Sequence, residues 1–236
     1  IDENRTPFTP KQIQTLITKF PNLNILVQPS KNRCFKDEDY FKAGAKIEEV
    51  ISRSDIIFGV KEVDISTLVE NKTYLFFSHT SKVRKDIYQT TQDKAITYKK
   101  DLLRETKKKK ITLIDYENIR EISGKEYRYL GFGRFAGIVG CYNTLNLYLK
   151  LQKEQSLPRA FEINSYEKIK KLISKQNFNK LKILQTGRGN VAKGAMEVLK
   201  HANIKQISVN DYLNKKYNAV SYTHIRAHET RHDLVC

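Results

Sequence analysis

The fold class expected for this chain follows from the stretch LKILQTGRGNVAKGAMEVLKHA, residues 181–202. The stretch begins as an apolar strand, passes through a glycine turn and ends as an amphipathic helix. It matches the G-x-G-x-x-A fingerprint of dinucleotide-binding domains. The first glycine allows a tight turn, the second lets a pyrophosphate approach the backbone, and Ala192 lets the helix pack closely on the strand. The residues predicted to hold the cofactor in this turn are Gly187, Arg188, Gly189, Asn190 and Val191.

A second strand is predicted after this helix, and its last residue bears on the choice of cofactor. The segment KQISVND, residues 205–211, ends in Asp211, about 20 residues beyond the glycines. An acid at this place hydrogen-bonds the adenosine ribose of NAD and repels the 2′-phosphate of NADP. The sequence therefore predicts NAD as the cofactor, with Asp211 in the site. The alternative is a plain glycine-rich turn without a nucleotide.

Strand and helix patterns alternate along the first half of the chain. Strands are expected at residues 23–28, 55–62, 73–80 and 111–117, and helices at 37–53 and 99–110. We interpret the strand at 55–62 as buried on both faces, because its apolar residues form a run. Such alternation with short connections is typical of an α/β fold with a largely parallel sheet.

Polar side chains follow three of these strands. Lys61 and Glu62, His79, and Asp115 and Glu117 all lie where an apolar strand ends. Open α/β sheets bind ligands beyond the carboxyl ends of their strands, so we expect these residues to form one cluster. A lysine, a histidine and carboxylates together could transfer protons near neutral pH. Solvated strand ends are the alternative.

A nearly uncharged segment, residues 134–152, is predicted to be a buried helix that packs closely against another backbone and bridges two domains. A further helix at 165–176 has Ser165 as its expected N-cap. We accordingly divide the chain into a first domain at 1–133 and the start of a dinucleotide-binding domain at 134–219.

Composition narrows the range of partners and compartments. The formal charge is +17 and the mean hydropathy is −0.57. The lysines are dispersed and interleaved with acids, which is typical of a solvated surface, and we do not expect nucleic-acid binding. The sequence shows neither an apolar run of about 18 residues nor a signal peptide, so we expect a cytoplasmic protein without membrane contact. The spacing of Cys34, Cys141 and Cys236 predicts free thiols.

Five short motifs carry a resemblance to a known family. They are RTPFTP (5–10), GVKE (59–62), FFSHTSK (76–82), LIDYE (113–117) and YRYLGFGRFAG (127–137). Together they resemble the alanine dehydrogenase and transhydrogenase N-terminal superfamily, particularly its lysine-forming saccharopine dehydrogenase branch. The resemblance covers roughly residues 1–218. Arg134 departs from the family pattern, which leaves its role open.

The resemblance implies an enzyme of two Rossmann-like domains that binds a small amino-acid substrate between them. With NAD it would oxidise saccharopine to an imine, which water splits into lysine and 2-oxoglutarate. Lys61 and His79 would be the acid–base pair and Glu62 and Glu117 would tune them. The substrate carboxylates would be held by Arg5, Lys82 and Arg128. An alanine dehydrogenase-like enzyme and a nucleotide-binding module without turnover are the alternatives, and the oligomeric state stays open.

The last segment, residues 220–236, changes character abruptly. We interpret it as a foreign tail that makes no selected contacts, and the dinucleotide-binding domain before it as incomplete. His224, His228 and His232 would share one face of a helix in this tail. We do not expect a metal site there, because few carboxylates surround the histidines.

Overall fold

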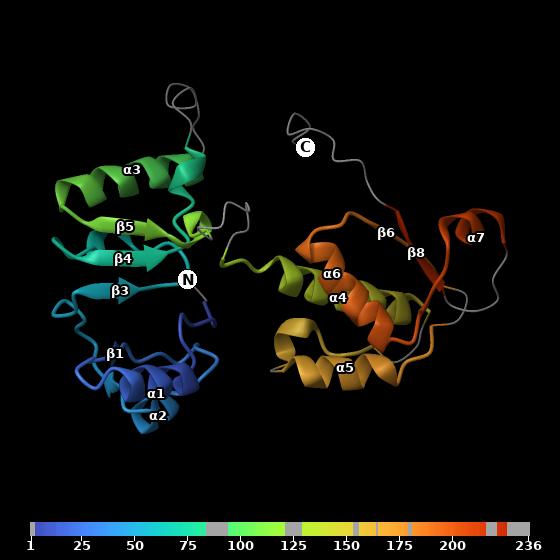
Figure 1. Ribbon diagram of the computed structural model, residues 1–236, viewed down its shortest axis with the longest axis horizontal. Coiled ribbons are helices and arrows are strands. Elements are labelled where there is room, and N and C mark those ends of the chain that lie inside the picture. The colour runs from blue at the N-terminus through green and yellow to red at the C-terminus, as the bar shows by residue number, and fades with distance from the viewer. Residues whose placement is uncertain are drawn as a thin grey trace. The chain divides into compact units, whose positions relative to one another are not determined.

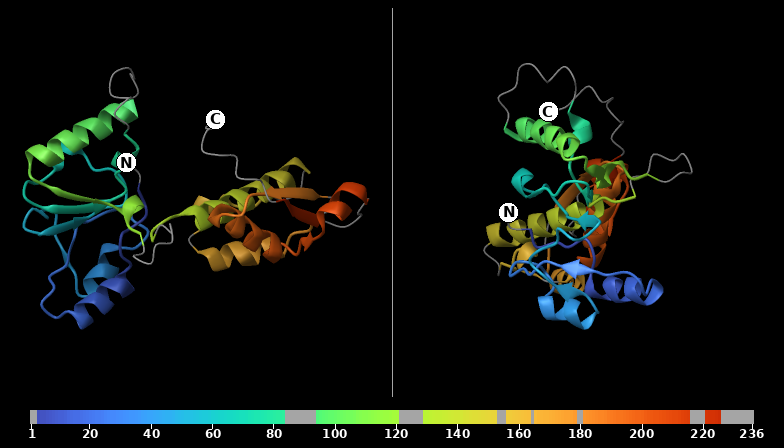
Figure 2. Two further views of the ribbon diagram at one scale, coloured as in Figure 1. Left: turned by 45° about the horizontal axis from the view of Figure 1, so that its top comes forward. Right: turned by 90° about the vertical axis from the view of Figure 1, so that its left-hand side faces the viewer.

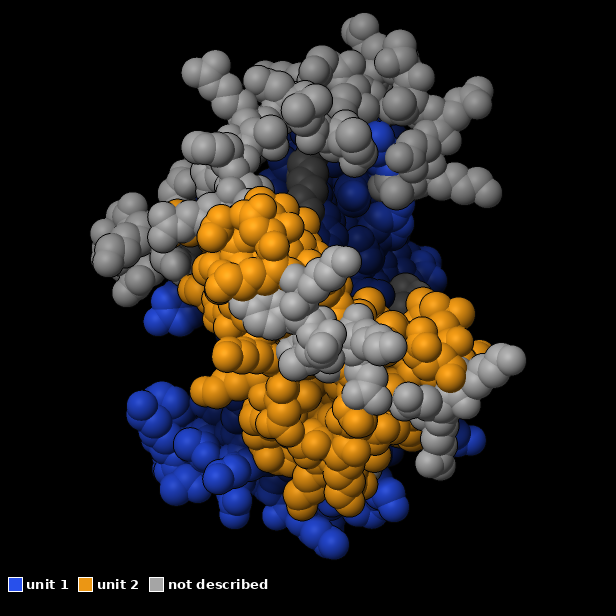
Figure 3. Space-filling model, turned by 90° about the vertical axis from the view of Figure 1, so that its right-hand side faces the viewer, with its two compact units in different colours: residues 1–130 blue, residues 131–236 orange. Residues whose placement is uncertain are grey.

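The computed structural model describes residues 3–83, 94–120, 129–152, 156–163, 165–178, 181–215 and 221–225. The chain forms two compact units, residues 1–130 and 131–236, which Figure 3 distinguishes by colour. Each unit is described by itself below.

Unit 1 is built on a parallel sheet of three strands. These are β3 (Ile56–Phe58), β4 (Thr73–Phe76) and β5 (Thr112–Asp115), in the order β3-β4-β5. The helix α3 (Lys94–Lys108) lies along the sheet (Figure 1) and contributes the fully buried Leu102 to the core, with Ile57, Tyr74 and Phe76. The predicted α/β class with parallel strands is confirmed.

The strand at β3 is shorter than predicted and is not buried on both faces. Ile57 points into the core, whereas Ile56 and Phe58 are 52% and 41% exposed. The apolar run at 55–62 therefore alternates between the core and the surface, as side chains of a strand must.

A smaller layer of unit 1 precedes this sheet. The helices α1 (Pro10–Lys19) and α2 (Asp37–Lys42) accompany two short parallel strands, β1 (Leu26–Val27) and β2 (Lys46–Ile47). The helix predicted at 37–53 is wrong beyond Lys42. Gly44 has a φ of 96°, which ends the helix, and the following residues pair with β1 instead.

Unit 2 contains three longer helices and a three-stranded parallel sheet of its own, which Figures 1 and 2 show. The helices are α4 (Gly133–Leu151), α5 (Tyr166–Ser174) and α6 (Asn190–His201), with a short α7 (Val209–Asn214). The strands are β6 (Lys182–Thr186), β7 (Lys205–Gln206) and β8 (Ser221–Ile225). The short 3₁₀ helix of unit 2 is η5 (Ala160–Glu162), and those of unit 1 are η1 (Ile65–Thr67), η2 (Thr80–Lys82) and η4 (Tyr116–Asn118). Ser165 caps α5 as predicted, since its side chain accepts a hydrogen bond from the Lys168 N–H.

The foreign origin of residues 220–236 stays a prediction, but the strand β8 within this segment does make contacts with unit 2. This strand lies between β6 and β7 and pairs in parallel with both. Tyr222 is buried in the core of unit 2, and Ser221 and Thr223 are also buried. His224 belongs to this strand and not to a helix, while His228 and His232 lie outside the described residues.

The predicted close approach of the helix at 134–152 to another backbone is confirmed. A β-carbon placed on Gly137 of α4 would lie 1.9 Å from the carbonyl oxygen of Val191 in α6. A β-carbon on Gly194 of α6 would lie 1.9 Å from the carbonyl oxygen of Arg134. Real β-carbons do not approach an oxygen so closely, so only glycine permits this crossing.

Two cysteines are free thiols, as predicted: Cys34 is exposed, and Cys141 is partly covered within unit 2. Burial raises the pKa of the Cys141 thiol to about 12. Cys236 lies outside the described residues. None of the helices in the described part of the chain combines the length and apolar character that crossing a bilayer requires.

Candidate active site and dinucleotide loop

His79 and Glu117 form the central pair of the candidate site in unit 1. His79 follows β4 and Glu117 follows β5, and the parallel register that pairs Phe76 with Asp115 brings both loops to one edge of the sheet. The Nδ1 atom of His79 lies 2.8 Å from Oε2 of Glu117. The carboxylate side chain is 8% exposed and the imidazole 35%. A histidine that a buried carboxylate orients, and that solvent still reaches, is suited to proton transfer.

Hydrogen bonds of Ser78 and Asp115 support the backbone next to this pair. The buried Ser78 hydroxyl donates to Oδ2 of Asp115 over 2.9 Å, and Oδ1 of the same carboxylate accepts the Glu117 backbone N–H over 2.9 Å. The backbone of His79 is left-handed, with a φ of 52°. Residues with a β-carbon keep this conformation where surrounding contacts impose it. Sequence reasoning placed Asp115 in the cluster but missed Ser78, whose only signal is its position directly before the histidine.

Lys61 contacts a different carboxylate, that of Glu3. Its Nζ atom lies 3.9 Å from Glu3 Oε2. Arg5 donates to both oxygens of Glu3, from Nε over 2.7 Å and from Nη2 over 2.6 Å. The Arg5 hydrogen bonds lower the pKa of Glu3, and the charge of Lys61 lowers it further. Glu3 thus joins two predicted site cations, and sequence reasoning missed it because one acid near the start of the chain carries no motif.

The backbone brings Lys61 and His79, the two predicted proton-transfer residues, close to the same edge of the unit 1 sheet. Pairing continues beyond the strands, since the Phe77 N–H donates to the Val60 carbonyl over 3.0 Å. Lys61 and His79 therefore each lie within two residues of a paired position. Their described contacts lead to separate carboxylates, so each has its own acidic neighbour.

The other predicted residues of unit 1 are less fully defined. Glu62 is half-buried, and its charge contributes to raising the pKa of Tyr98 to about 12, where burial is the larger cause. Lys82 is the last residue of η2, and the structure describes only its backbone. Arg128 lies outside the described residues. The substrate-binding roles of Arg5, Lys82 and Arg128 stay predictions.

The dinucleotide loop of unit 2 has the predicted local structure. Gly187 has a φ of 87°, which favours glycine, and Gly189 is the N-cap of α6 with an ordinary φ of −76°. Asn190 and Val191 begin the helix, and Arg188 lies between the glycines. Apart from the chain neighbours of each glycine, no heavy atom of the described residues lies within 4 Å of a β-carbon placed on Gly187 or Gly189. The loop therefore fits a pyrophosphate, because it leaves a space that a side chain would fill.

Asp211 does not lie at the end of a strand, and this prediction is wrong. The strand β7 ends at Gln206, and Asp211 lies in the first turn of α7. Its N–H donates to the N-cap Ser208 hydroxyl over 3.0 Å, and its Oδ1 lies 2.8 Å from Lys215 Nζ. Ser208 begins a new helix, which is why the strand cannot continue.

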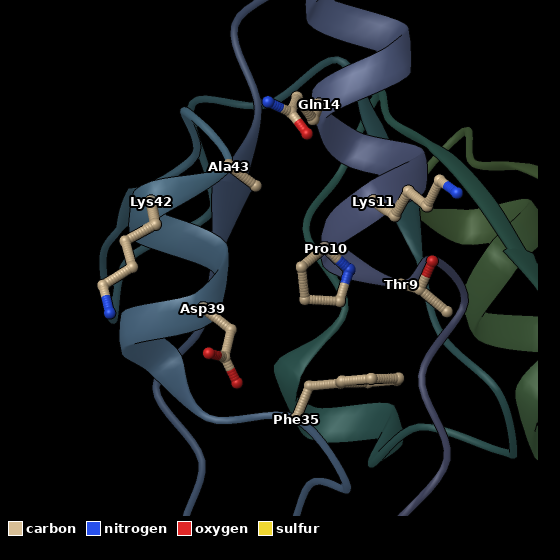
Figure 4. A pocket seen from close by; sticks show the side chains of 8 residues that line it. All are labelled: Thr9, Pro10, Lys11, Gln14, Phe35, Asp39, Lys42 and Ala43. Carbon is tan, nitrogen blue, oxygen red and sulfur yellow. The ribbon is translucent and has the colours of Figure 1, made fainter.

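An open groove of about 770 Å³ lies between α1 and α2. Figure 4 shows Lys11 and Gln14 of α1 on one side and Asp39 and Lys42 of α2 on the other. Its lining contains none of the predicted site residues. The strand-end cluster is therefore the better candidate for chemistry.

Comparison with known proteins gives a consistent family assignment. Residues 1–137 match the family model described as alanine dehydrogenase/PNT, N-terminal domain. The mitochondrial alpha-aminoadipic semialdehyde synthase of Rattus norvegicus is 31% identical over 249 residues, covering 94% of this chain and 25% of the relative. The alpha-aminoadipic semialdehyde synthase of Arabidopsis thaliana is 29% identical, over 84% of this chain and 19% of the relative.

The fold is also similar to that of a solved L-alanine dehydrogenase. The TM-score is 0.59 at 15% identity, and the match covers 95% of this chain and 58% of the other. This likeness supports the α/β architecture. The chain spans about a quarter of the length of the rat relative.

Proposed function

This chain belongs to the alanine dehydrogenase/PNT N-terminal domain family, and we propose that it is part of an NAD-dependent oxidoreductase that converts saccharopine to lysine and 2-oxoglutarate. The proposed reaction acts on the CH–NH group of this amino-acid adduct. The alpha-aminoadipic semialdehyde synthases are the relatives that favour such a substrate over alanine.

The reaction needs two kinds of transfer. Bound NAD would accept a hydride from the substrate carbon, which is the cofactor's own chemistry. A base on the protein takes the proton from the substrate nitrogen, so that a C=N bond forms. Water then adds to the carbon, a base takes the proton of the resulting hydroxyl, and an acid returns a proton to the nitrogen as the C–N bond breaks. Lysine leaves with that nitrogen and 2-oxoglutarate with the carbonyl oxygen.

His79 and Lys61 are the proposed carriers of these protons. Glu117 holds the imidazole of His79 through Nδ1, which directs the other ring nitrogen away from the carboxylate. Lys61 lies beside Glu3 and is half-exposed, so its ammonium group is accessible to substrate. Arg5 would share its guanidinium between Glu3 and a substrate carboxylate. The single observation that carries the proposal is the 2.8 Å contact of His79 with the buried Glu117 at the ends of adjacent parallel strands.

The deciding experiment measures NADH formation by the protein with NAD and saccharopine. We expect saccharopine-dependent absorbance at the NADH band and none with L-alanine. Turnover of L-alanine alone would replace the proposal with an alanine dehydrogenase. NADH binding without turnover of either substrate would favour a nucleotide-binding module.

The glycine loop gives a test of cofactor binding that does not depend on turnover. Gly189→Ala should weaken NADH binding by about 10-fold or more, because the methyl group would occupy the space that a pyrophosphate needs. The fold should be unaffected, since Gly189 has an ordinary φ and open surroundings among the described residues. Fluorescence titration with NADH and thermal unfolding measure the two effects. Unchanged NADH affinity in a folded variant would contradict the assignment of this loop.

NAD is the proposed cofactor in preference to NADP. The negative charge of Asp211 supports this preference, although the residue lies in α7 and not at the end of a strand. Its carboxylate would oppose a 2′-phosphate near the end of β7, while Lys215 offsets part of its charge. We expect NADH to bind more tightly than NADPH, and Asp211→Asn to narrow this difference. Tighter binding of NADPH by the unaltered protein would reverse the proposed preference.

The cytoplasm is the proposed compartment. The free thiols of Cys34 and Cys141 agree with a reducing environment. The rat relative is described as mitochondrial, so microscopy of the tagged protein must distinguish the two compartments.

A further inference from the structure

The crossing of α4 and α6 places the start of one helix against the dinucleotide loop. A β-carbon on Gly133, the first residue of α4, would lie 3.2 Å from Cβ of Asn190 and 3.8 Å from the backbone nitrogen of Val191. Asn190 and Val191 are the first residues of α6, directly after the loop glycines. Any movement of α4 along α6 would therefore displace the backbone that faces the proposed cofactor.

The glycine contacts alone do not resist such sliding. Gly137 and Gly194 bring the two backbones together, but glycine has no side chain to interlock with a neighbouring helix. Buried side chains such as Ile138 of α4 and Val198 of α6 pack in the same core, and a polar contact of defined geometry adds to them in setting the position of one helix along the other.

Arg134 and Glu197 supply that contact. Arg134 Nε donates to Glu197 Oε1 over 2.7 Å, and Arg134 Nη2 donates to Oε2 over 2.6 Å. This two-bond geometry fixes direction as well as distance. The Tyr166 hydroxyl of α5 donates to Oε2 of the same carboxylate over 3.2 Å, so the three helices meet at Glu197. The Arg134 hydrogen bond also lowers the pKa of Glu197.

Because Arg134 and Glu197 are partly exposed to solvent, their ion pair can set the position of the helices while contributing little to folding stability. The two side chains are 45% and 35% exposed, and ion pairs this open to solvent contribute little to folding. Their geometry can nevertheless matter for a ligand, because small displacements of binding groups have large effects.

We propose that Arg134 and Glu197 are positioning residues for the dinucleotide loop: their two-bond contact fixes the position of α4 along α6 and thereby the N–H groups that receive the cofactor phosphates. The inference rests on the proposed function, since it concerns the same nucleotide site. It also gives a role to Arg134, which departs from the pattern of the family motif.

The test compares NADH affinity with folding in matched variants of the whole chain. Glu197→Gln and Arg134→Lys should each raise the NADH dissociation constant about 3- to 10-fold, with an unchanged far-UV spectrum and a thermal midpoint within a few degrees. The control Glu167→Gln removes a carboxylate from α5 that pairs with Lys170 of the same helix, and it should bind NADH as the unaltered protein does. The charge-exchanged pair Arg134→Glu with Glu197→Arg should recover part of the lost affinity.

Unchanged NADH affinity in Glu197→Gln and Arg134→Lys would overturn this inference while leaving the proposed function standing. Loss of affinity that merely follows loss of folded protein would overturn it as well. Failure of the unaltered chain to bind NADH would instead reject the nucleotide site itself, and this inference with it.

Discussion

Gly137→Ala is expected to destabilise unit 2 by about 3 kcal/mol. The added carbon would lie 1.9 Å from the Val191 carbonyl oxygen and 2.9 Å from the Ala195 nitrogen. Both atoms belong to the backbone of α6, which cannot move aside as a side chain can. The helices must separate, and the core that includes Ile138 and Val198 loses contact. Chemical denaturation followed by circular dichroism measures the loss.

Gly140→Ala is the matched control on the same helix. Apart from the chain neighbours and the backbone of the same helix, no heavy atom of the described residues lies within 4 Å of a β-carbon at Gly140, so alanine should fit freely. It should even stabilise α4 by up to about 1 kcal/mol, because alanine favours helix more than glycine does. Equal stability of the Gly137 and Gly140 variants would show that the close crossing of α4 and α6 is wrong.

His79→Gln is expected to lower saccharopine turnover by about 100-fold, the usual scale for losing a positioned acid or base. Glutamine can still donate a hydrogen bond toward Glu117 but cannot exchange protons near neutral pH. The loss should appear in kcat, and one limb of the pH–rate profile should flatten. Lys61→Met should lower turnover by about 100-fold for the same reason.

One substitution away from the cluster serves as a control. Lys107→Met, on the exposed side of α3, repeats the chemical change of the Lys61 variant without altering the site. It should keep turnover within about two-fold of the unaltered protein, since surface changes are usually mild. Full activity in the His79 and Lys61 variants would mean that the strand-end residues are solvated surface.

Local signals in the sequence predicted the strand, the glycine turn and the helix of residues 181–202 well. The glycines, the apolar strand before them and the helix after them all lie within one short segment, so no distant contact was needed. The helix at 37–53 failed for the opposite reason. Its amphipathic pattern was plausible, but β2 forms by pairing with β1, a segment distant in the sequence.

Asp211 and Glu3 show two further limits. The segment SVND contains a serine followed three residues later by an acid, which is a helix-start pattern, and we interpreted it as the end of a strand. That signal was present and overlooked. The Glu3 contacts had no such signal, because they depend on how the start of the chain meets the loop after β3. The His79–Glu117 contact was predictable only as a shared edge of the sheet.

The position of β8 has a consequence for the order in which the chain is made. Synthesis proceeds from the N-terminus, and the three strands of the unit 1 sheet have all emerged by Asp115. The unit 2 sheet differs, because β8 follows both β6 and β7 in the sequence and yet lies between them. On the nascent chain, the edges of β6 and β7 that pair with β8 therefore stay unpaired until Ile225, the last residue of β8, has left the ribosome. During that interval the exposed edges could recruit other strands, so chaperone capture should concentrate on chains that end between Gln206 and Ser221.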